Sequence, residues 1–320
     1  MLTYPEPAGL SSLLVAQRDK IRQGTFEAYK LEKILMKKII ALAVAAVVAA
    51  PAMADLTIGA SARYQIDNGA NTAADETSAT TNRILVSFAG STTAESGLFV
   101  SAGATLQIAA NDAVNGTDVD GDNNIVVGNE MANVALGYTE SAGVYAKGAD
   151  AFRVAPAAGL QERILGRHSD TVILNVTAVE GLTAQLTGYL TNDSLRAVVG
   201  YDFGSFAVKA GFDNADDDLG AGEDAMQLMA STDLGGVAVT ASYADMDATD
   251  AQFVNVGASY MGFSLNYETA EVAGGADSDA LYGAYAVANV AGLDGLNVTV
   301  GAGSADNADT KVGVRLDYAF

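Results

Sequence analysis

The chain has no cysteine and no tryptophan, and only four prolines and one histidine among its 320 residues. Without cysteine it can form neither a disulfide framework nor a thiolate metal site. Basic residues are also scarce: 17 Lys and Arg stand against 39 Asp and Glu, a formal net charge of −22. A chain of this charge repels phosphate backbones, so we do not expect it to bind nucleic acid.

Long apolar runs are missing too, although half of the residues are hydrophobic. No stretch is long enough to cross a bilayer as a helix. The longest run, IIALAVAAVVAA at 39–50, follows MKK at 36–38 and precedes PAMADL at 51–56. A basic start, a short apolar core and small residues in this order predict a secretory signal peptide cut after Ala54. A short buried helix is the alternative interpretation.

These features divide the chain into three parts. Residues 1–35 have no clear pattern and precede a better start at Met36, so we interpret them as an upstream extension outside the fold. Residues 36–54 are the predicted signal peptide, and 55–320 are the predicted exported protein. The exported part keeps ten of the 17 basic residues and 35 of the 39 acidic ones, so it is strongly acidic.

The exported part shows one repeated pattern, in which apolar and polar residues alternate. The stretch LTIGASARYQID at 56–67 is an example, and NRILVSFAG at 82–90 repeats it. A period of two indicates β-strands, whereas a helix needs a period of 3.6. We expect sixteen strands, near 56–68, 81–91, 97–110, 124–131, 133–141, 171–179, 182–192, 194–203, 206–215, 224–234, 237–246, 251–261, 262–270, 279–291, 295–304 and 310–320.

The distribution of charge over the two faces favours an all-β transmembrane antiparallel barrel over a soluble sandwich. The polar faces carry small residues and spaced charges, whereas the apolar faces are almost free of charge. In a barrel the apolar face meets lipid and the polar face meets a water-filled lumen. Closing the sheet also removes exposed strand edges, which matters because no helices are left to cover them. An exported sandwich or a repeat protein is the alternative fold.

The chain ends in KVGVRLDYAF, whose alternation continues to the final Phe320. This ending resembles the terminal signature of Gram-negative outer-membrane proteins, which implies that Tyr318 and Phe320 form a signal read by the outer-membrane assembly machinery. Aromatic rings of this kind belong at the membrane–water interface. The terminal strand must also pair with the first strand, near 56–68, to close the cylinder.

The organisation of the exported part resembles that of the sixteen-stranded general porins, especially the Rhodobacter-type porins. The stretches 82–108 and 197–215 resemble hairpins of that family, and 143–170 is the longest stretch without clear alternation. The resemblance implies that this stretch folds into the lumen as a constriction loop. It further implies a water-filled channel for passive diffusion of small hydrophilic solutes and ions, a homotrimer, and contact with lipid and lipopolysaccharide in the outer membrane of a Gram-negative bacterium.

Charged residues on the inward faces and in the expected constriction loop are the candidate pore-lining residues, because rings of charge give pores their selectivity. Arg63, Arg83, Lys311 and Arg315 should form a basic stripe on one wall, with Arg196 and Lys209 roughly across the barrel. The loop adds residues of both signs: Lys147, Asp150, Arg153, Glu162, Arg163, Arg167 and His168. The alternative for each of these residues is a solvated charge without a sieving role.

Acidic residues crowd the long loops, and at a pore mouth they raise the local cation concentration. We therefore expect a mild cation preference. Asp118, Asp120 and Asp122 offer alternating carboxylates that could hold Ca²⁺, but Asn123 and Asn129 stand where a helix-loop-helix site has Gly and Glu, so a solvated loop is the alternative. No cofactor is otherwise expected.

Two other function classes are known for outer-membrane barrels, enzymes and non-conducting structural or adhesive proteins. An outer-membrane enzyme needs a base such as histidine, but His168 has no convergent partners in the sequence and no G-x-S-x-G motif occurs, so we expect no catalysis. A non-conducting structural or adhesive outer-membrane barrel would need bulky side chains to fill its lumen, whereas the expected inner faces are rich in small residues.

Overall fold

The computed structural model divides into two units, residues 1–52 and 53–320. All residues that the structure describes belong to the second unit: 55–68, 79–111, 115–119, 123–139, 141–145, 168–190, 194–214, 224–247, 250–273, 275, 277–306 and 310–320. The upstream extension and the signal peptide predicted from the sequence therefore lie outside the described residues.

The described part consists almost entirely of β-strands. The strands are β1 (Asp55–Asp67), β2 (Ala79–Thr93), β3 (Phe99–Asn111), β4 (Asn115–Val119), β5 (Asn123–Gly128), β6 (Ala132–Thr139), β7 (His168–Val176), β8 (Leu182–Tyr189), β9 (Leu195–Asp202), β10 (Phe206–Asn214), β11 (Ala225–Leu234), β12 (Val237–Met246), β13 (Ala251–Tyr260), β14 (Phe263–Val272), β15 (Ser278–Val287), β16 (Leu296–Ala305) and β17 (Lys311–Ala319). One 3₁₀ turn, η3 (Val290–Gly292), lies between β15 and β16. Within the described residues, no helix is long and apolar enough to cross a membrane.

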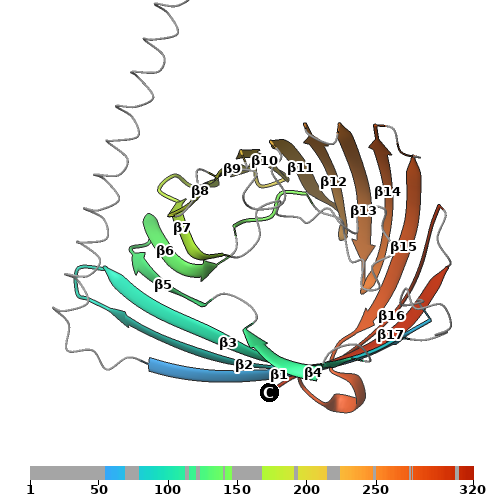
Figure 1. The fold of residues 1–320 in the computed structure, drawn as a ribbon, viewed down its shortest axis with the longest axis horizontal. Helices are drawn as coiled ribbons and strands as arrows, with labels where there is room; N and C mark the ends of the chain where they lie inside the picture. Colours follow the sequence, from blue (N-terminus) through green and yellow to red (C-terminus); the bar gives the residue numbers. More distant parts are fainter. Residues whose placement is uncertain are drawn as a thin grey trace, which may run out of the picture. The chain divides into compact units, whose positions relative to one another are not determined.

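The strands form a closed antiparallel barrel, which Figure 1 shows as a ring. Successive strands pair with each other, and β17 pairs with β1. Strands β4 and β5 both pair with β3, one along Leu106–Ala110 and the other along Phe99–Gly103. They share one position in the ring, so the seventeen strands make a sixteen-position barrel. The predicted fold class is confirmed.

Closure extends to the last residue of the chain. The backbone N–H of Phe320 donates to the carbonyl of Ala60 at 3.0 Å, and the N–H of Ala60 donates to the carbonyl of Phe320 at 3.1 Å. The ring centroids of Tyr318 and Phe320 lie 5.4 Å apart. The predicted pairing of the terminal strand with the first strand is therefore confirmed.

Each of the sixteen predicted strands coincides with an observed one to within a few residues, but two details were wrong. The stretch between the predicted strands 97–110 and 124–131 contains β4, whose sequence NGTDV has a turn-like composition but pairs with β3. His168, which we placed in the constriction loop, is the first residue of β7 and pairs with Thr139. In both cases, pairing with the neighbouring strand overrides the weak local pattern.

The two faces of the barrel are inverted relative to a soluble protein. Apolar side chains on the outer face are exposed, including Ile58, Leu265 and Leu281 at 61%, 59% and 53%. Polar side chains on the inner face are enclosed, including Asn255 and Glu268. This is the arrangement of a barrel surrounded by lipid, since apolar groups face hydrocarbon and polar groups face the interior.

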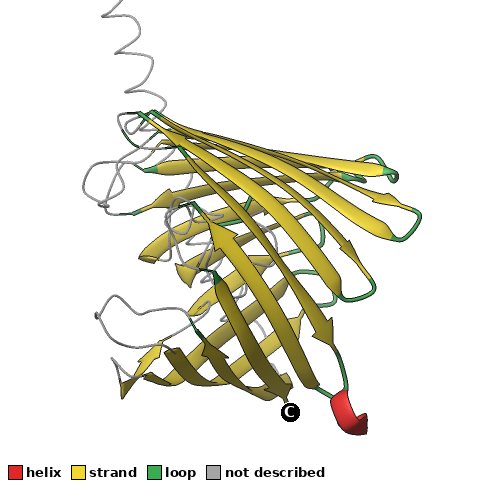
Figure 2. Cartoon of the chain, turned by 90° about the vertical axis from the view of Figure 1, so that its right-hand side faces the viewer, coloured by secondary structure: helices red, strands yellow, loops and turns green. Residues whose placement is uncertain are grey.

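Tight turns join the strands at one end of the barrel, where the C-terminus also lies (Figure 2). The β11–β12 turn is Gly235–Gly236, with φ of 69° and 92°. Positive φ at both central residues is required by the two-residue hairpin turn that matches strand twist. The longer connections are at the opposite ends of the strands.

Candidate pore constriction

Residues 141–145, which we call the constriction segment, leave β6 and run along the inside of the barrel (Figure 1). The N–H of Ala142 donates to Gln185 Oε1 on β8 at 2.6 Å. The hydroxyl of Tyr145 donates to Glu268 Oε2 on β14 at 3.1 Å. The segment therefore lies against the inner wall between β8 and β14. The predicted infolding after the β6 strand is confirmed for these residues.

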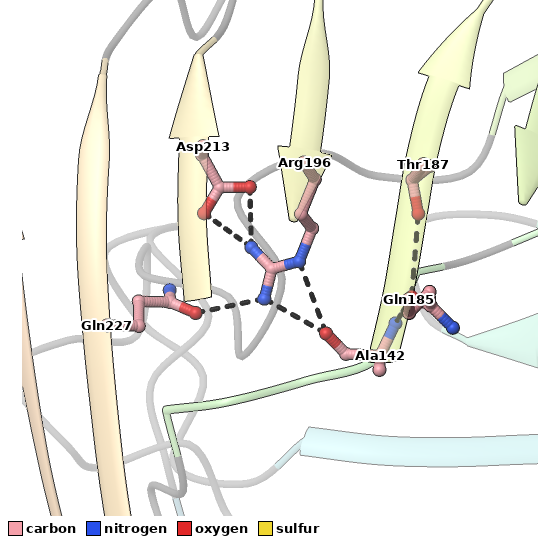
Figure 3. Close-up of polar contacts among 6 residues, drawn as sticks. All are labelled: Ala142, Gln185, Thr187, Arg196, Asp213 and Gln227. Atoms are coloured by element: carbon pink, nitrogen blue, oxygen red, sulfur yellow. Dashed lines mark hydrogen bonds and ion pairs between the residues drawn. The ribbon is translucent and has the colours of Figure 1, made fainter. Parts of the chain in front are cut away.

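Arg196 on β9 holds the first part of the segment (Figure 3). Its Nη2 donates to the carbonyl of Ala142 at 2.9 Å and to Gln227 Oε1 on β11 at 3.0 Å, and its Nε reaches the same carbonyl at 3.2 Å. Its Nη1 binds both carboxylate oxygens of Asp213 on β10. The side chains of Arg196, Asp213 and Gln227 are 0% exposed. We call these three residues the Arg196 cluster.

Val144 packs into a recess left by Gly211 on β10. A Cβ added at Gly211 would lie 2.9 Å from Val144 Cγ2 and 3.5 Å from Val144 Cβ. As long as Val144 is present, any larger residue at 211 would therefore push the segment away from the wall. The recess brings the segment into direct contact with the sheet, beside the guanidinium of Arg196.

Tyr145 anchors the far part of the segment. Its ring is buried with Ala244, Phe253 and Ala270 on three successive strands. Burial, followed by the charge of the Glu268 carboxylate, raises the pKa of Tyr145 far above its ordinary value. The hydroxyl therefore stays protonated and donates a hydrogen bond to the Glu268 carboxylate.

Glu268 has further support from its neighbours. Asn255 Nδ2 on β13 lies 3.4 Å from Glu268 Oε2 and donates to the hydroxyl of Tyr282 on β15 at 3.0 Å. All of these side chains are enclosed. Buried polar groups of this kind need partners, so the network fixes where Tyr145 can sit.

The basic stripe predicted from the sequence lies on β17, β1 and β2. We call Arg63, Arg83, Lys311 and Arg315 the basic wall. Arg63 and Arg83 are direct cross-strand partners. Asp317 lies between Arg63 and Arg315 and accepts a hydrogen bond from the Nε of each, at 2.6 and 2.7 Å. These three side chains are 23–32% exposed, so they remain in contact with lumen water.

The other predicted pore residues are placed as follows. Lys209 lies on the inward face of β10, together with Gly211 and Asp213. Arg196 also points inward, but none of its side chain reaches water. His168 is on β7, and its side chain is not described. Residues outside the described part are Lys147, Asp150, Arg153, Glu162, Arg163 and Arg167.

Asp213, Gln227, Glu268, Tyr145 and Asp317 were not predicted as site residues. The alternation of residues along each strand could have shown that the four strand residues face inward. Asp213, for example, lies on the same face of β10 as Lys209. Alternation does not reveal which of them meet across strands or reach the constriction segment. Those contacts depend on register and on the path of the segment.

The calcium site predicted from Asp118, Asp120 and Asp122 stays a prediction. Asp118 is on β4 with its side chain undescribed, and Asp120 and Asp122 lie outside the described residues. Among the described residues, no group of three or more His, Cys, Asp or Glu is placed to hold a metal ion.

Comparison with known proteins agrees with this geometry. Among solved structures, a multiply substituted porin of Rhodopseudomonas blastica superimposes with a TM-score of 0.64 at 13% identity, covering 83% of this chain and all of the other. A triple variant of the same porin gives 0.63 at 14% identity with the same coverage. No curated protein matches. A family model described as Gram-negative porin matches residues 41–262, more than two thirds of the chain. The chain therefore belongs to the Gram-negative porin family and is a porin channel of the outer membrane.

Proposed function

We propose that this porin lets small hydrophilic solutes and ions diffuse passively through its lumen, with a mild preference for cations. The observation that carries the proposal is the placement of the constriction segment. It lies against the inner wall from β8 to β14, while the basic wall lies on β17, β1 and β2. The aperture is then the space between the segment and the basic wall.

A cation preference is supported by the different depths at which acidic and basic residues stand along the pore. The exported part carries 35 of the 39 acidic residues, and several of them stand between β3 and β5 and between β10 and β11. Acids at a mouth attract cations, but their field is screened beyond about 8 Å at physiological salt. The basic wall opposes them deeper in the lumen, where Asp317 already offsets part of its charge. The net preference should therefore be small.

A liposome-swelling assay tests diffusion directly. Refolded exported protein in vesicles should admit small neutral sugars quickly and larger ones progressively more slowly, because an open constriction sieves by size. Vesicles without protein are the control. If the protein leaves even the smallest sugars excluded, the alternative of a non-conducting structural or adhesive barrel replaces this proposal.

Assembly follows the family in this proposal: a homotrimer embedded in lipid and lipopolysaccharide and inserted by the outer-membrane assembly machinery. The exposed apolar outer face supports contact with lipid or with other copies of the barrel. Chemical cross-linking in mild detergent should yield trimers that collapse to monomers after heating. A product no larger than a monomer would refute the trimer and leave the channel proposal standing.

A further inference from the structure

Arg196 and Asp213 carry opposite charges, and neither side chain reaches water. A pair so enclosed and so neutralised contributes little electric field to the lumen, unlike the partly exposed basic wall. Moving charges out of water is costly and needs a compensating set of partners. The structure shows where those partners lie: the guanidinium donates hydrogen bonds to Asp213, to Gln227 and to the carbonyl of Ala142 (Figure 3).

We propose that Arg196 is a clamp that holds the constriction segment back against the wall and so keeps the aperture open. This inference rests on the proposed function, diffusion through the lumen. Arg196 is then a positioning residue. It acts on permeation through Ala142 and makes no contact with the solute.

The geometry of the clamp is specific to arginine. Two nitrogens of one guanidinium converge on the Ala142 carbonyl, while the third binds Asp213. A planar fork with five N–H donors can serve three partners at once, whereas a lysine ammonium is a compact charge on a flexible stem. Lysine would keep the charge opposite Asp213 but not the fork that holds the carbonyl.

The direction of movement after release follows from the packing. Behind the segment is the sheet, with Val144 seated directly on Gly211. A released segment cannot move outward through the strands, so it can only move into the lumen. Without Arg196, the part-buried carbonyl of Ala142 would lose both of its guanidinium donors, and lumen water is the group that can replace them. Loss of the clamp should therefore narrow the pore and make it fluctuate.

The test combines a release with a reversible lock. Arg196→Met together with Asp213→Asn removes the clamp without leaving a buried lone charge. Val144→Cys with Gly211→Cys supplies the lock, since a Cβ at 211 lies 3.5 Å from Val144 Cβ, within the usual range for a disulfide. The chain has no cysteine of its own, so no other pairing can form within one chain.

Single-channel conductance is measured for both cysteine-bearing proteins, reduced and oxidised. With Arg196 and Asp213 intact, oxidation should form the disulfide rapidly and leave conductance unchanged. In the released protein, the reduced form should conduct less, by about twofold, with frequent partial closures, because a constriction limits flow through a pore. Oxidation should restore the full conductance. Disulfide formation should be several times slower in the released protein. Its rate is measured from the loss of free thiol.

Two controls separate the clamp from charge and from folding. Lys209→Met removes the same charge from the neighbouring strand and should not slow disulfide formation. Arg196→Lys, which keeps the ion pair, should show the partial closures of the released protein. Equal conductance of released and intact proteins in the reduced state, or a deficit that oxidation does not repair, would overturn the clamp. If the intact protein does not conduct at all, the proposed function fails, and the rate of disulfide formation still tests the clamp.

Discussion

Arg196 and Arg63 are both inward-facing arginines on strands, yet their surroundings differ completely. Arg196 is 0% exposed and binds the constriction segment, whereas Arg63 is 32% exposed and binds Asp317 on the neighbouring strand. The difference arises because the constriction segment contacts Arg196 on β9, whereas the partner of Arg63 is a side chain of the next strand. The charged groups of this lumen therefore fall into two kinds: enclosed groups that bind the constriction segment, and partly exposed groups that remain in contact with water.

Asp317→Asn should shift ion selectivity toward anions. Asp317 accepts hydrogen bonds from both Arg63 and Arg315, so its loss leaves the basic wall with more uncompensated positive charge. Reversal potentials in a salt gradient measure the shift. Asp294→Asn, an equal charge change in the exposed β15–β16 turn, is the matched control and should have little effect. Equal reversal potentials for both variants would show that the basic wall does not contribute to selectivity.

At the scale of elements, the sequence predicted the strands well because period-two alternation is imposed by the environment on each face. Strand β4 was missed because Asn115 and Gly116 begin it with residues typical of turns. Parity also predicted that Arg63, Arg83, Lys311 and Arg315 face inward. The partners of those residues could not be predicted, because a register shift of one residue changes every cross-strand neighbour. The path of Ala142 and Tyr145 likewise depends on contacts distant in sequence.

Gly295→Ala should destabilise the barrel where the β15–β16 turn meets the terminal strand. Gly295 has φ of 82°, and an added Cβ would lie 2.3 Å from the carbonyl oxygen of Ala319. Backbone strain and this clash together should lower the free energy of unfolding by about 3 kcal/mol. Urea unfolding of the refolded protein in detergent measures the loss.

Gly204→Ala is the matched control for this change. Gly204 has φ of 84° but nothing within 4 Å of an added Cβ. It should lose only the conformational cost of a left-handed residue, about 1–2 kcal/mol. Equal losses at the two positions would show that contact with the terminal strand has no role.

Phe320→Ser should impair insertion into the outer membrane while leaving synthesis and export intact. The substitution keeps the backbone pairing between Phe320 and Ala60 but removes a ring that is 68% exposed at the end of the barrel. Outer-membrane yield and resistance to heat in detergent measure the effect. Deleting residue 320 removes the pairing as well and should be worse. Normal yield and heat resistance for the serine variant would refute the assembly role of the ring.

At the scale of the whole molecule, closure explains why so apolar a chain can also be so acidic. The ring of strands closes through the β17–β1 pairing, so the barrel has no free end strand, and the apolar faces turn outward to lipid. Acidic residues then collect in the interior and in the connections, where water solvates them. The interior holds the constriction segment through buried partners, and the aqueous path remains beside it.

Processing should give a mature protein that begins at Asp55, where β1 also begins. N-terminal sequencing of the protein isolated from outer membranes tests this expectation. A mature chain that retains residues 1–35, or that starts elsewhere in the signal peptide, would contradict our division of the sequence.

The most direct test of the account is planar-bilayer recording of refolded residues 55–320, with reversal potentials measured at several salt concentrations. We expect stepwise conductance and a mild cation preference that declines as salt rises, because the acidic mouth is screened more easily than the confined basic wall. A triple Asp-to-Asn change at Asp216, Asp217 and Asp218 should weaken the preference at low salt only. A protein that gives no conductance steps, or one that selects anions at low salt, would contradict the account.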